Sequence, residues 1–143
     1  MTERIYKGKC FCGAVEVAVT AAPVVMGYCH CDSCRKWSAS PVNAFALWKA
    51  ANVKVTAGAD NVGAYSKTPN SVRKWCKLCG GHLLTEHPSI GLIDVYPAIL
   101  PELDFKPREH IHYQEAVLRI VDSLPKNKDL AKRAGGSGVL LPS

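Results

Sequence analysis

The sequence predicts a mostly β domain built around bound metal. Short runs rich in β-branched and aromatic residues recur along the chain, and Gly, Pro and Asn separate them. Seven cysteines fall into three tight clusters, which is the usual arrangement of metal ligands in a reducing compartment. At 143 residues the chain is long enough for one domain with a sizeable core.

The strands are predicted from apolar runs of five to seven residues, taken in chain order. Many short strands at this spacing favour an all-β or mostly β domain. The runs are Val15–Val19, Val24–Tyr28, Val42–Trp48, Val53–Ala57 and Leu92–Tyr96, and His110–Gln114 predicts a further strand near the end.

The last part of the chain is harder to assign. Glu115–Leu124 fits either a helical face or extended chain, and Pro125 ends it. Gly135-Gly-Ser-Gly138 is typical of a flexible segment. We therefore expect a folded domain at residues 1–130 and a flexible C-terminal tail at residues 131–143.

The cysteine clusters contain two, three and two residues, which suggests a division into four and three. Four thiolates close a tetrahedral zinc site, whereas three leave one position open for water or substrate. We expect one structural metal and one that could do chemistry. The clusters are Cys10-Phe-Cys12, Cys29-His-Cys31-Asp-Ser-Cys34 and Cys76-Lys-Leu-Cys79.

The first and last clusters can share a metal. Cys10 and Cys12 would share one face of a strand, because side chains two positions apart on extended chain point the same way. Cys76-Lys-Leu-Cys79-Gly80-Gly81 resembles a zinc knuckle, in which a tight turn aims backbone N–H groups at the sulfurs and glycine accepts a positive φ.

The middle cluster predicts a metal held at the edge of a pocket. Cys29 and Cys31 share a face, and Cys34 follows where Asp32 and Ser33 could start a helical turn. The alternative is that this cluster supplies two ligands to a single four-cysteine site and leaves one spare thiol. A count of zinc per chain separates these interpretations.

Charge and hydropathy narrow the classes of partner. The formal net charge of +6 is reduced once thiolates and zinc are counted, and the late basic run has few aromatics, so a nucleic-acid partner is not favoured. No apolar run approaches the ~20 residues that cross a bilayer, and residues 1–9 lack a signal-peptide core. We expect a cytoplasmic protein.

With all seven cysteines in this order and spacing, the chain resembles the glutathione-dependent formaldehyde-activating enzyme family, which includes centromere protein V. The resemblance covers about residues 5 to 126. It also includes Phe45, Gly58, Tyr65, Thr85-Glu-His87-Pro88, His110 and Leu124-Pro125.

The resemblance implies short antiparallel sheets stacked like a tent over zinc. It implies that Cys10, Cys12, Cys76 and Cys79 bind a structural zinc and that Cys29, Cys31 and Cys34 bind a catalytic zinc. The implied activity is a carbon-sulfur lyase of the S-(hydroxymethyl)glutathione synthase type, which joins formaldehyde to the thiol of glutathione. A tryptophan common in the family before the late Leu-Pro is replaced here by Val117 or Leu118.

The other candidate residues are weighed against ordinary structural roles. Cations would help a site with several thiolates, and the candidates are Arg35, Lys36 and Arg73. His30 is expected in the core or behind the ligands, since it faces away from Cys29 and Cys31 on extended chain. Roles for His82, His87, His110 and His112 stay open. The alternative function is a non-catalytic, zinc-stabilised binding module with a weakly basic surface.

Overall fold

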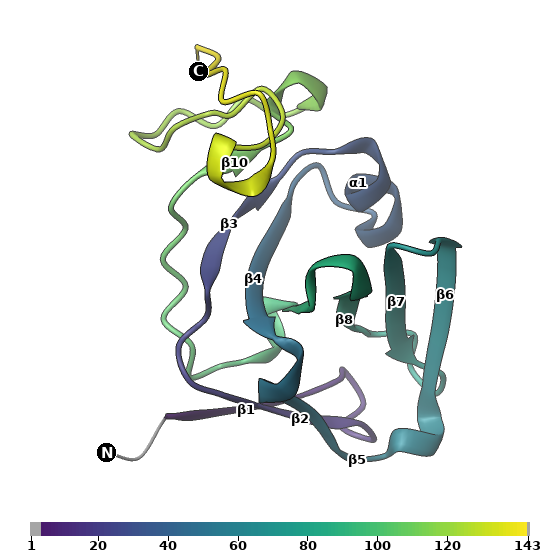
Figure 1. The fold of residues 1–143 in the computed structure, drawn as a ribbon. Helices are drawn as coiled ribbons and strands as arrows, with labels where there is room; N and C mark the ends of the chain where they lie inside the picture. The colour runs from purple at the N-terminus through teal and green to yellow at the C-terminus, as the bar shows by residue number, and fades with distance from the viewer. Residues whose placement is uncertain (1–3, 143) are drawn as a thin grey trace. The chain divides into compact units, whose positions relative to one another are not determined.

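A computed structural model of the protein describes the structure of residues 4–142 (Figure 1). The predicted mostly β class is confirmed, because ten strands and one α-helix occur within these residues. The strands are β1 (Ile5–Lys9), β2 (Glu16–Thr20), β3 (Val25–Cys29), β4 (Asn43–Lys49), β5 (Val53–Ala57), β6 (Val62–Thr68), β7 (Ser71–Cys76), β8 (His82–His87), β9 (Leu92–Val95) and β10 (His110–Ile111). The helix is α1 (Asp32–Ser38), and the 3-10 helices are Ala50–Asn52, Ala59–Asn61, Pro88–Ile90, Pro97–Ile99, Tyr113–Glu115 and Lys132–Ala134.

The chain forms two compact units. The first unit contains the chain up to Val24 together with Ala46–Phe105, and the second contains Val25–Phe45 and the chain from Lys106 onward. Strand β4 begins in the second unit and ends in the first. The expected domain end at residue 130 stays a prediction.

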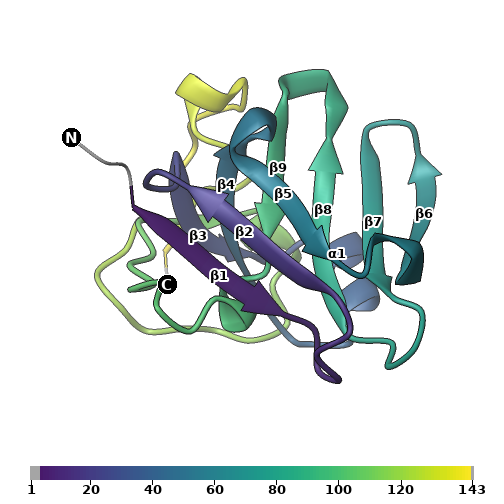
Figure 2. The same cartoon turned by 90° about the horizontal axis from the view of Figure 1, so that it is seen from below.

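A three-stranded antiparallel sheet, β1-β2-β5, lies at one side of the first unit (Figure 2). Its central strand alternates as a half-buried strand should, with Val17 and Val19 buried and Glu16 exposed. Gly8 in β1 is required by a close approach, because a Cβ there would lie 2.1 Å from the Ile99 carbonyl oxygen.

The rest of the first unit is an antiparallel meander. Strands β6, β7, β8 and β9 pair in chain order, and the end of β4 pairs with β9. The fully buried side chains of Trp48, Leu83 and Val95 form its core. The Trp48 Nε1–H group donates to the Ala21 carbonyl at 3.0 Å, which ties β4 to the turn after β2.

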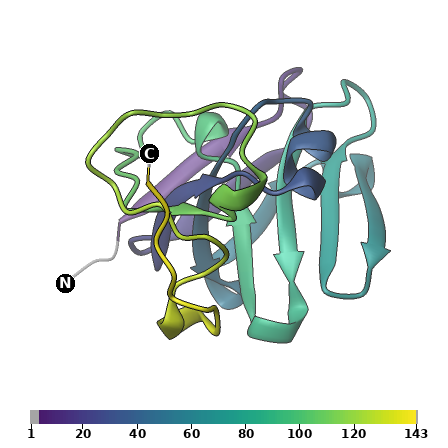
Figure 3. The same ribbon diagram turned by 90° about the horizontal axis from the view of Figure 1, so that it is seen from above.

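The second unit has a parallel strand pair and a long irregular segment. Strand β10 pairs with β3 through His110 opposite Tyr28, and the green-to-yellow chain after β10 lies beside this pair (Figure 3). Backbone hydrogen bonds join two parts of this segment, since Lys128 N–H donates to Val139 O and Leu141 N–H donates to Lys126 O, each at 2.8 Å.

The core of this unit contains an unusual share of polar side chains. The buried polar residues are His30, Asn43, Glu109, His110, Lys126 and Asn127. Buried polar groups need hydrogen-bond partners, so this composition implies an internal polar network.

Sequence patterns predicted some elements better than others. The Val53–Ala57 strand has the predicted bounds, and the runs behind β2, β3, β4 and β9 are correct within one residue at each end. Strands β1, β6, β7 and β8 were missed, and β10 covers only two of the five predicted residues. Glu115–Leu124 forms neither an α-helix nor a strand.

No helix within residues 4–142 has the length and apolar character to cross a membrane.

Candidate metal centres

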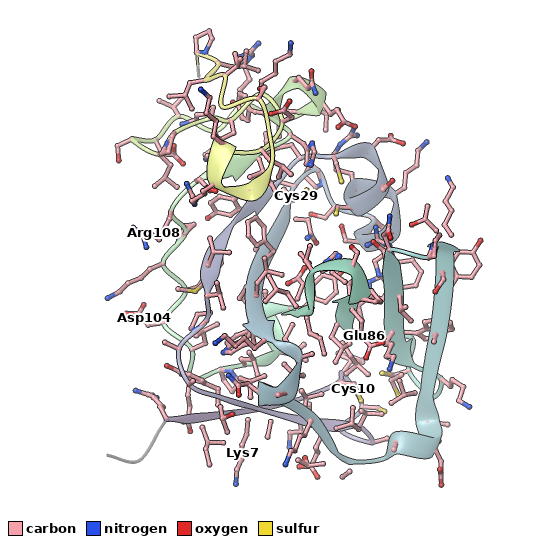
Figure 4. All side chains as sticks on the ribbon, in the orientation of Figure 1. Lys7, Cys10, Cys29, Glu86, Asp104 and Arg108 are labelled. Atoms are coloured by element: carbon pink, nitrogen blue, oxygen red, sulfur yellow. The ribbon has the colours of Figure 1, made fainter. Side chains whose placement is uncertain are left out.

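Four thiols of the first unit gather in one cluster, although they come from two distant parts of the chain. The sulfurs of Cys10, Cys12, Cys76 and Cys79 all lie within 4.8 Å of one another. The Sγ–Sγ distances are 3.7 Å for Cys10–Cys12 and 3.8 Å for Cys12–Cys76. Figure 4 shows several sulfur atoms beside the label of Cys10.

These distances fit a metal. A tetrahedral zinc with Zn–S bonds of about 2.3 Å separates its sulfurs by about 3.8 Å. The donor set also fits, since four thiolates are a standard closed ligand set for zinc. The four-cysteine cluster could therefore hold a metal ion.

The first two thiols are presented by a turn, so the prediction that they share a strand face is wrong. Strand β1 ends at Lys9, and a turn follows in which Gly13 N–H donates to Cys10 O at 3.0 Å. Gly13 has φ of +83°, a conformation that glycine adopts readily. The reversal lets the Val15 N–H group donate to Cys10 Sγ at 3.3 Å.

The second pair has the predicted knuckle geometry. Strand β7 ends at Cys76, and the Gly80 N–H group donates a hydrogen bond to Cys76 O at 2.7 Å. Gly80 has φ of +76°, and Gly81 N–H donates to Cys79 Sγ at 3.3 Å. Backbone donors thus face the sulfur, as thiolate stabilisation requires.

The thiols of the four-cysteine cluster differ in pKa. Burial raises the pKa of Cys10, but hydrogen bonds from Val15 N–H and the neighbouring thiols outweigh it and lower the pKa to about 6. A hydrogen bond from Ala14 N–H lowers the pKa of Cys12, but burial and hydrogen bonding to the other three thiols raise it to about 11. Cys10 is therefore more acidic than Cys12.

The other three thiols gather in the second unit. Cys29 ends β3, Cys31 is the N-cap residue of α1, and Cys34 lies in the first turn of α1. Their sulfurs also lie within 4.8 Å of one another. The Cys34 N–H group donates to Cys31 Sγ at 3.3 Å, so the cysteine takes the capping place of a serine or aspartate. The expected helical turn at Asp32 is present.

This cluster favours one thiolate strongly. Hydrogen bonds from the Cys29 and Cys34 thiols lower the pKa of Cys31 to about 2, and the Cys34 N–H group and the charge of His112 act in the same direction. Hydrogen bonds with Cys31 and Cys34, followed by burial, raise the pKa of Cys29. The metal-free cluster therefore carries its first negative charge on Cys31.

His112, whose charge lowers the pKa of Cys31, lies where the backbone becomes irregular. Strand β10 ends at Ile111, and His112 has φ of +52°, so the predicted strand His110–Gln114 does not continue to His112. A non-glycine residue in this region is uncommon and marks a position that its surroundings over-determine. His112 Nδ1 lies 3.8 Å from Glu115 Oε2, while Glu115 Oε1 accepts from Asp32 N–H at 3.0 Å.

Behind the three thiols, His30 joins a buried chain of polar side chains. His30 Nε2 lies 2.8 Å from His110 Nδ1, and His110 Nε2 lies 2.8 Å from Asp122 Oδ2. Lys126 Nζ pairs with Asp122 Oδ1. His30 is fully buried, as expected, and this burial is the main reason that its pKa is lowered to about 4.

The structure also gives the positions of the other basic residues and histidines considered from the sequence. Arg35 Nε donates to His30 O at 3.0 Å, and Lys36 pairs with Asp32 at 3.1 Å. Arg73, His82 and His87 lie in β7 and β8 of the first unit. Asp122, Lys126 and Glu115 were not singled out by sequence reasoning, because no local motif marks them.

Comparisons with known proteins find one matching family, a similar yeast protein and a similar solved structure. The model of a family described as "Glutathione-dependent formaldehyde-activating enzyme" matches residues 5–115. An uncharacterized lyase of Schizosaccharomyces pombe is 28% identical over 128 residues, which are 90% of this chain and 87% of the yeast protein. A crystal structure of a Rhodobacter sphaeroides protein has a TM-score of 0.58 and 26% identity, and the match covers 68% of this chain and 90% of that one.

Proposed function

Because the chain belongs to the glutathione-dependent formaldehyde-activating enzyme family, we propose that it is a zinc-dependent carbon-sulfur lyase. It forms or cleaves an S-hydroxymethyl adduct between a small thiol, such as glutathione, and formaldehyde or another small aldehyde. The observation that carries the proposal is the three-thiol cluster of Cys29, Cys31 and Cys34, which no fourth His, Cys, Asp or Glu of residues 4–142 completes.

The two clusters have different tasks in this proposal. Cys10, Cys12, Cys76 and Cys79 hold a structural zinc with a closed set of four ligands, which staples the turn after β1 to the knuckle after β7. Cys29, Cys31 and Cys34 hold the catalytic zinc and leave one position for the substrate. A bound zinc would lower the pKa of a substrate thiol that joins it.

The reaction balances without a redox partner. The thiol sulfur forms a bond to the aldehyde carbon, the carbonyl π bond breaks, and the thiol proton ends on the new hydroxyl oxygen. The reverse reaction breaks the carbon-sulfur bond and returns the proton to sulfur. The protein must therefore bind a thiolate beside three thiolates of its own and hold one proton during the step.

The second unit contains groups suited to both tasks. His112 is the imidazole whose charge acts on Cys31, and its partial exposure leaves it open to a substrate at the cluster. We assign it to hold the transferred proton. Arg35, fixed against the His30 carbonyl, supplies positive charge near the cluster.

The chemistry also suggests the compartment. All seven cysteines are free thiols in the structure, and clustered thiols stay reduced in the cytoplasm. We propose a cytoplasmic protein whose partners are a low-molecular-weight thiol and a small aldehyde.

The test is magnetization-exchange NMR between formaldehyde hydrate and S-hydroxymethylglutathione, with protein purified without oxygen. We expect the wild-type protein to accelerate exchange above the buffer control, because the adduct also forms spontaneously. Cys31→Ser should lose the acceleration and one zinc per chain while it keeps the other zinc and the circular dichroism of the wild type. Unchanged exchange in Cys31→Ser would reject the assignment of the catalytic zinc. A wild-type protein with no acceleration would favour a binding module.

A further inference from the structure

Four polar side chains of the second unit are hydrogen-bonded in series. Lys126 pairs with Asp122, Asp122 Oδ2 with His110 Nε2, and His110 Nδ1 with His30 Nε2, the last two at 2.8 Å each. His30 and His110 are fully buried, and only 2% of the Lys126 side chain is exposed. The chain links the C-terminal segment to the residue between Cys29 and Cys31.

The donor and acceptor of each hydrogen bond follow from the charged residues at one end of the series. Lys126 is a cation and can only donate, and the Asp122 carboxylate beside it can only accept. His110 must therefore donate from Nε2. A neutral imidazole with its proton on Nε2 has a bare Nδ1, so His30 must donate from its own Nε2.

The alternative is a doubly protonated His110, which would donate to both neighbours. Lys126 already neutralises Asp122, so this arrangement would bury one uncompensated positive charge. The rings of Tyr28 and Tyr113 pack against His110 with centroid distances of 5.1 and 5.6 Å, and neither offers a counter-charge. The buried surroundings thus favour the arrangement in which His110 carries one proton, on Nε2.

We propose that the Lys126–Asp122–His110–His30 chain is a positioning device for the three-cysteine centre. It fixes His30 as the Nε2–H tautomer and thereby orients the segment between two of the proposed ligands. It leaves His30 Nδ1, which is buried and has no hydrogen-bond partner among the described residues, as the acceptor for one small donor such as a water molecule.

The peptide of His30 is fixed as firmly as its ring. His30 N–H donates to Ile111 O at 3.1 Å, and its carbonyl accepts from Arg35 Nε at 3.0 Å. Together with the ring contact to His110, these bonds hold both peptide groups that lead to Cys29 and Cys31. Mutation of groups that orient metal ligands in this way typically costs about 10- to 100-fold in metal affinity.

The tautomers can be read directly from two-bond ¹H–¹⁵N correlation spectra of the imidazole rings near neutral pH. In the zinc-loaded wild-type protein we expect both His30 and His110 to carry their proton on Nε2 alone. A proton on Nδ1 of His30, or on both nitrogens of His110, would overturn the proposal. This reading requires no variant, so it cannot be lost to misfolding.

Asp122→Asn tests transmission along the chain. Lys126 should keep the amide oxygen, which turns the NH₂ group toward His110 and forces both histidines into the Nδ1–H form. His30 should change although Asp122 does not touch it. Asp129→Asn is the control, because Asp129 accepts from Ser137 in the same segment and does not belong to the Lys126–Asp122–His110–His30 series. An unchanged His30 signal in Asp122→Asn contradicts the proposal.

Metal affinity gives the functional readout. Competition with a chromophoric chelator should show that Asp122→Asn weakens one of the two zinc sites about 10-fold or more. The affected site should be the one that Cys31→Ser removes, while Asp129→Asn leaves both affinities unchanged. Equal weakening of both sites, or of neither, overturns the proposal. The proposal rests on the proposed function for its purpose, but neither readout uses turnover, so the two can fail separately.

Discussion

At the scale of single residues, His112 combines an unusual backbone with a chemical environment that suits proton transfer. Its φ of +52° places it in a region that asparagine tolerates better than most side chains. Asparagine is therefore the substitution that removes the imidazole with the least effect on folding.

We predict that His112→Asn lowers the exchange rate about 10²-fold, because general acid-base catalysis by a positioned imidazole contributes at least this much. The variant should still bind two zinc ions and unfold at the wild-type denaturant concentration. Glu115→Gln, which keeps an acceptor for Asp32 N–H, serves as the matched control and should lose less activity. A His112→Asn protein with wild-type exchange would exclude the imidazole from the step.

Asp94 is a second residue whose environment makes a measurable prediction. Burial raises its pKa to about 7, and the hydrogen bond from Ala46 N–H and the charge of Arg73 oppose this only in part. The folded protein therefore binds a proton that the unfolded chain releases near the ordinary aspartate pKa of 3.8. Folding stability falls as pH rises between these two values, and the loss is complete above pH 7.

Asp94→Asn cannot ionise, and its amide oxygen can still accept from Ala46 N–H. Relative to the wild type, the variant should gain about 1–3 kcal/mol of unfolding free energy between pH 5 and pH 8. Urea denaturation of both proteins at the two pH values measures this difference, and the other titrating groups cancel. A constant difference between the proteins would show that Asp94 keeps an ordinary pKa.

Local spacing predicted the residues of the site better than their connections. The knuckle at Cys76 and Cys79 and the helical turn after Cys31 follow from neighbouring residues, and the structure has both. The contact between His30 and His110 spans 80 positions, and that between His110 and Asp122 depends on an irregular segment. Such contacts arise from tertiary packing and leave no periodic signal in the sequence.

At the scale of elements, β3 leads directly into the three-cysteine cluster. Gly27 lies two residues before Cys29, and a Cβ there would be 2.6 Å from Glu109 O and 2.8 Å from Phe45 Cζ. The Glu109 carbonyl cannot yield easily, because it accepts from Tyr28 N–H at 3.0 Å. The absence of a side chain at Gly27 thus sets the path of the chain that carries the ligands.

Gly27→Ala should cost about 1–3 kcal/mol of unfolding free energy through overpacking. It should also weaken zinc at the three-cysteine cluster while the four-cysteine cluster keeps its metal. Gly91→Ala is the matched control, since a Cβ there meets nothing within 4 Å and only the positive φ is unfavourable. Metal analysis and urea denaturation of both variants decide the matter. Wild-type zinc affinity in Gly27→Ala would show that the packing of β3 does not determine the geometry of the three cysteine ligands.

Two of the strands missed from the sequence, β6 and β7, share a physical cause. Strand β6 is exposed at five of its seven residues, and β7 is half-buried at five of its six, so neither has a clear alternation of apolar and polar side chains. The run Val53–Ala57 does alternate, and it was predicted with correct bounds. The turn that presents Cys10 and Cys12 was also missed, because Gly13 acts through its backbone conformation.

At the scale of the whole molecule, each compact unit contains one cysteine cluster. The four-cysteine cluster joins residues 64 positions apart in the first unit, whereas the three-cysteine cluster uses six consecutive residues of the second. A staple across distant segments suits a structural metal, because it removes conformational freedom from a long loop of the unfolded chain. A compact cluster with an open position suits chemistry.

The central claim is that the four-cysteine site is closed and the three-cysteine site is open to a substrate thiol. ¹¹³Cd NMR of the cadmium-substituted protein tests it most directly, because the chemical shift reports how many sulfurs surround each ion. Two signals are expected, and added glutathione should shift only the one that Cys31→Ser lacks. If glutathione moved neither signal, or moved both alike, the account of one closed and one open centre would be wrong.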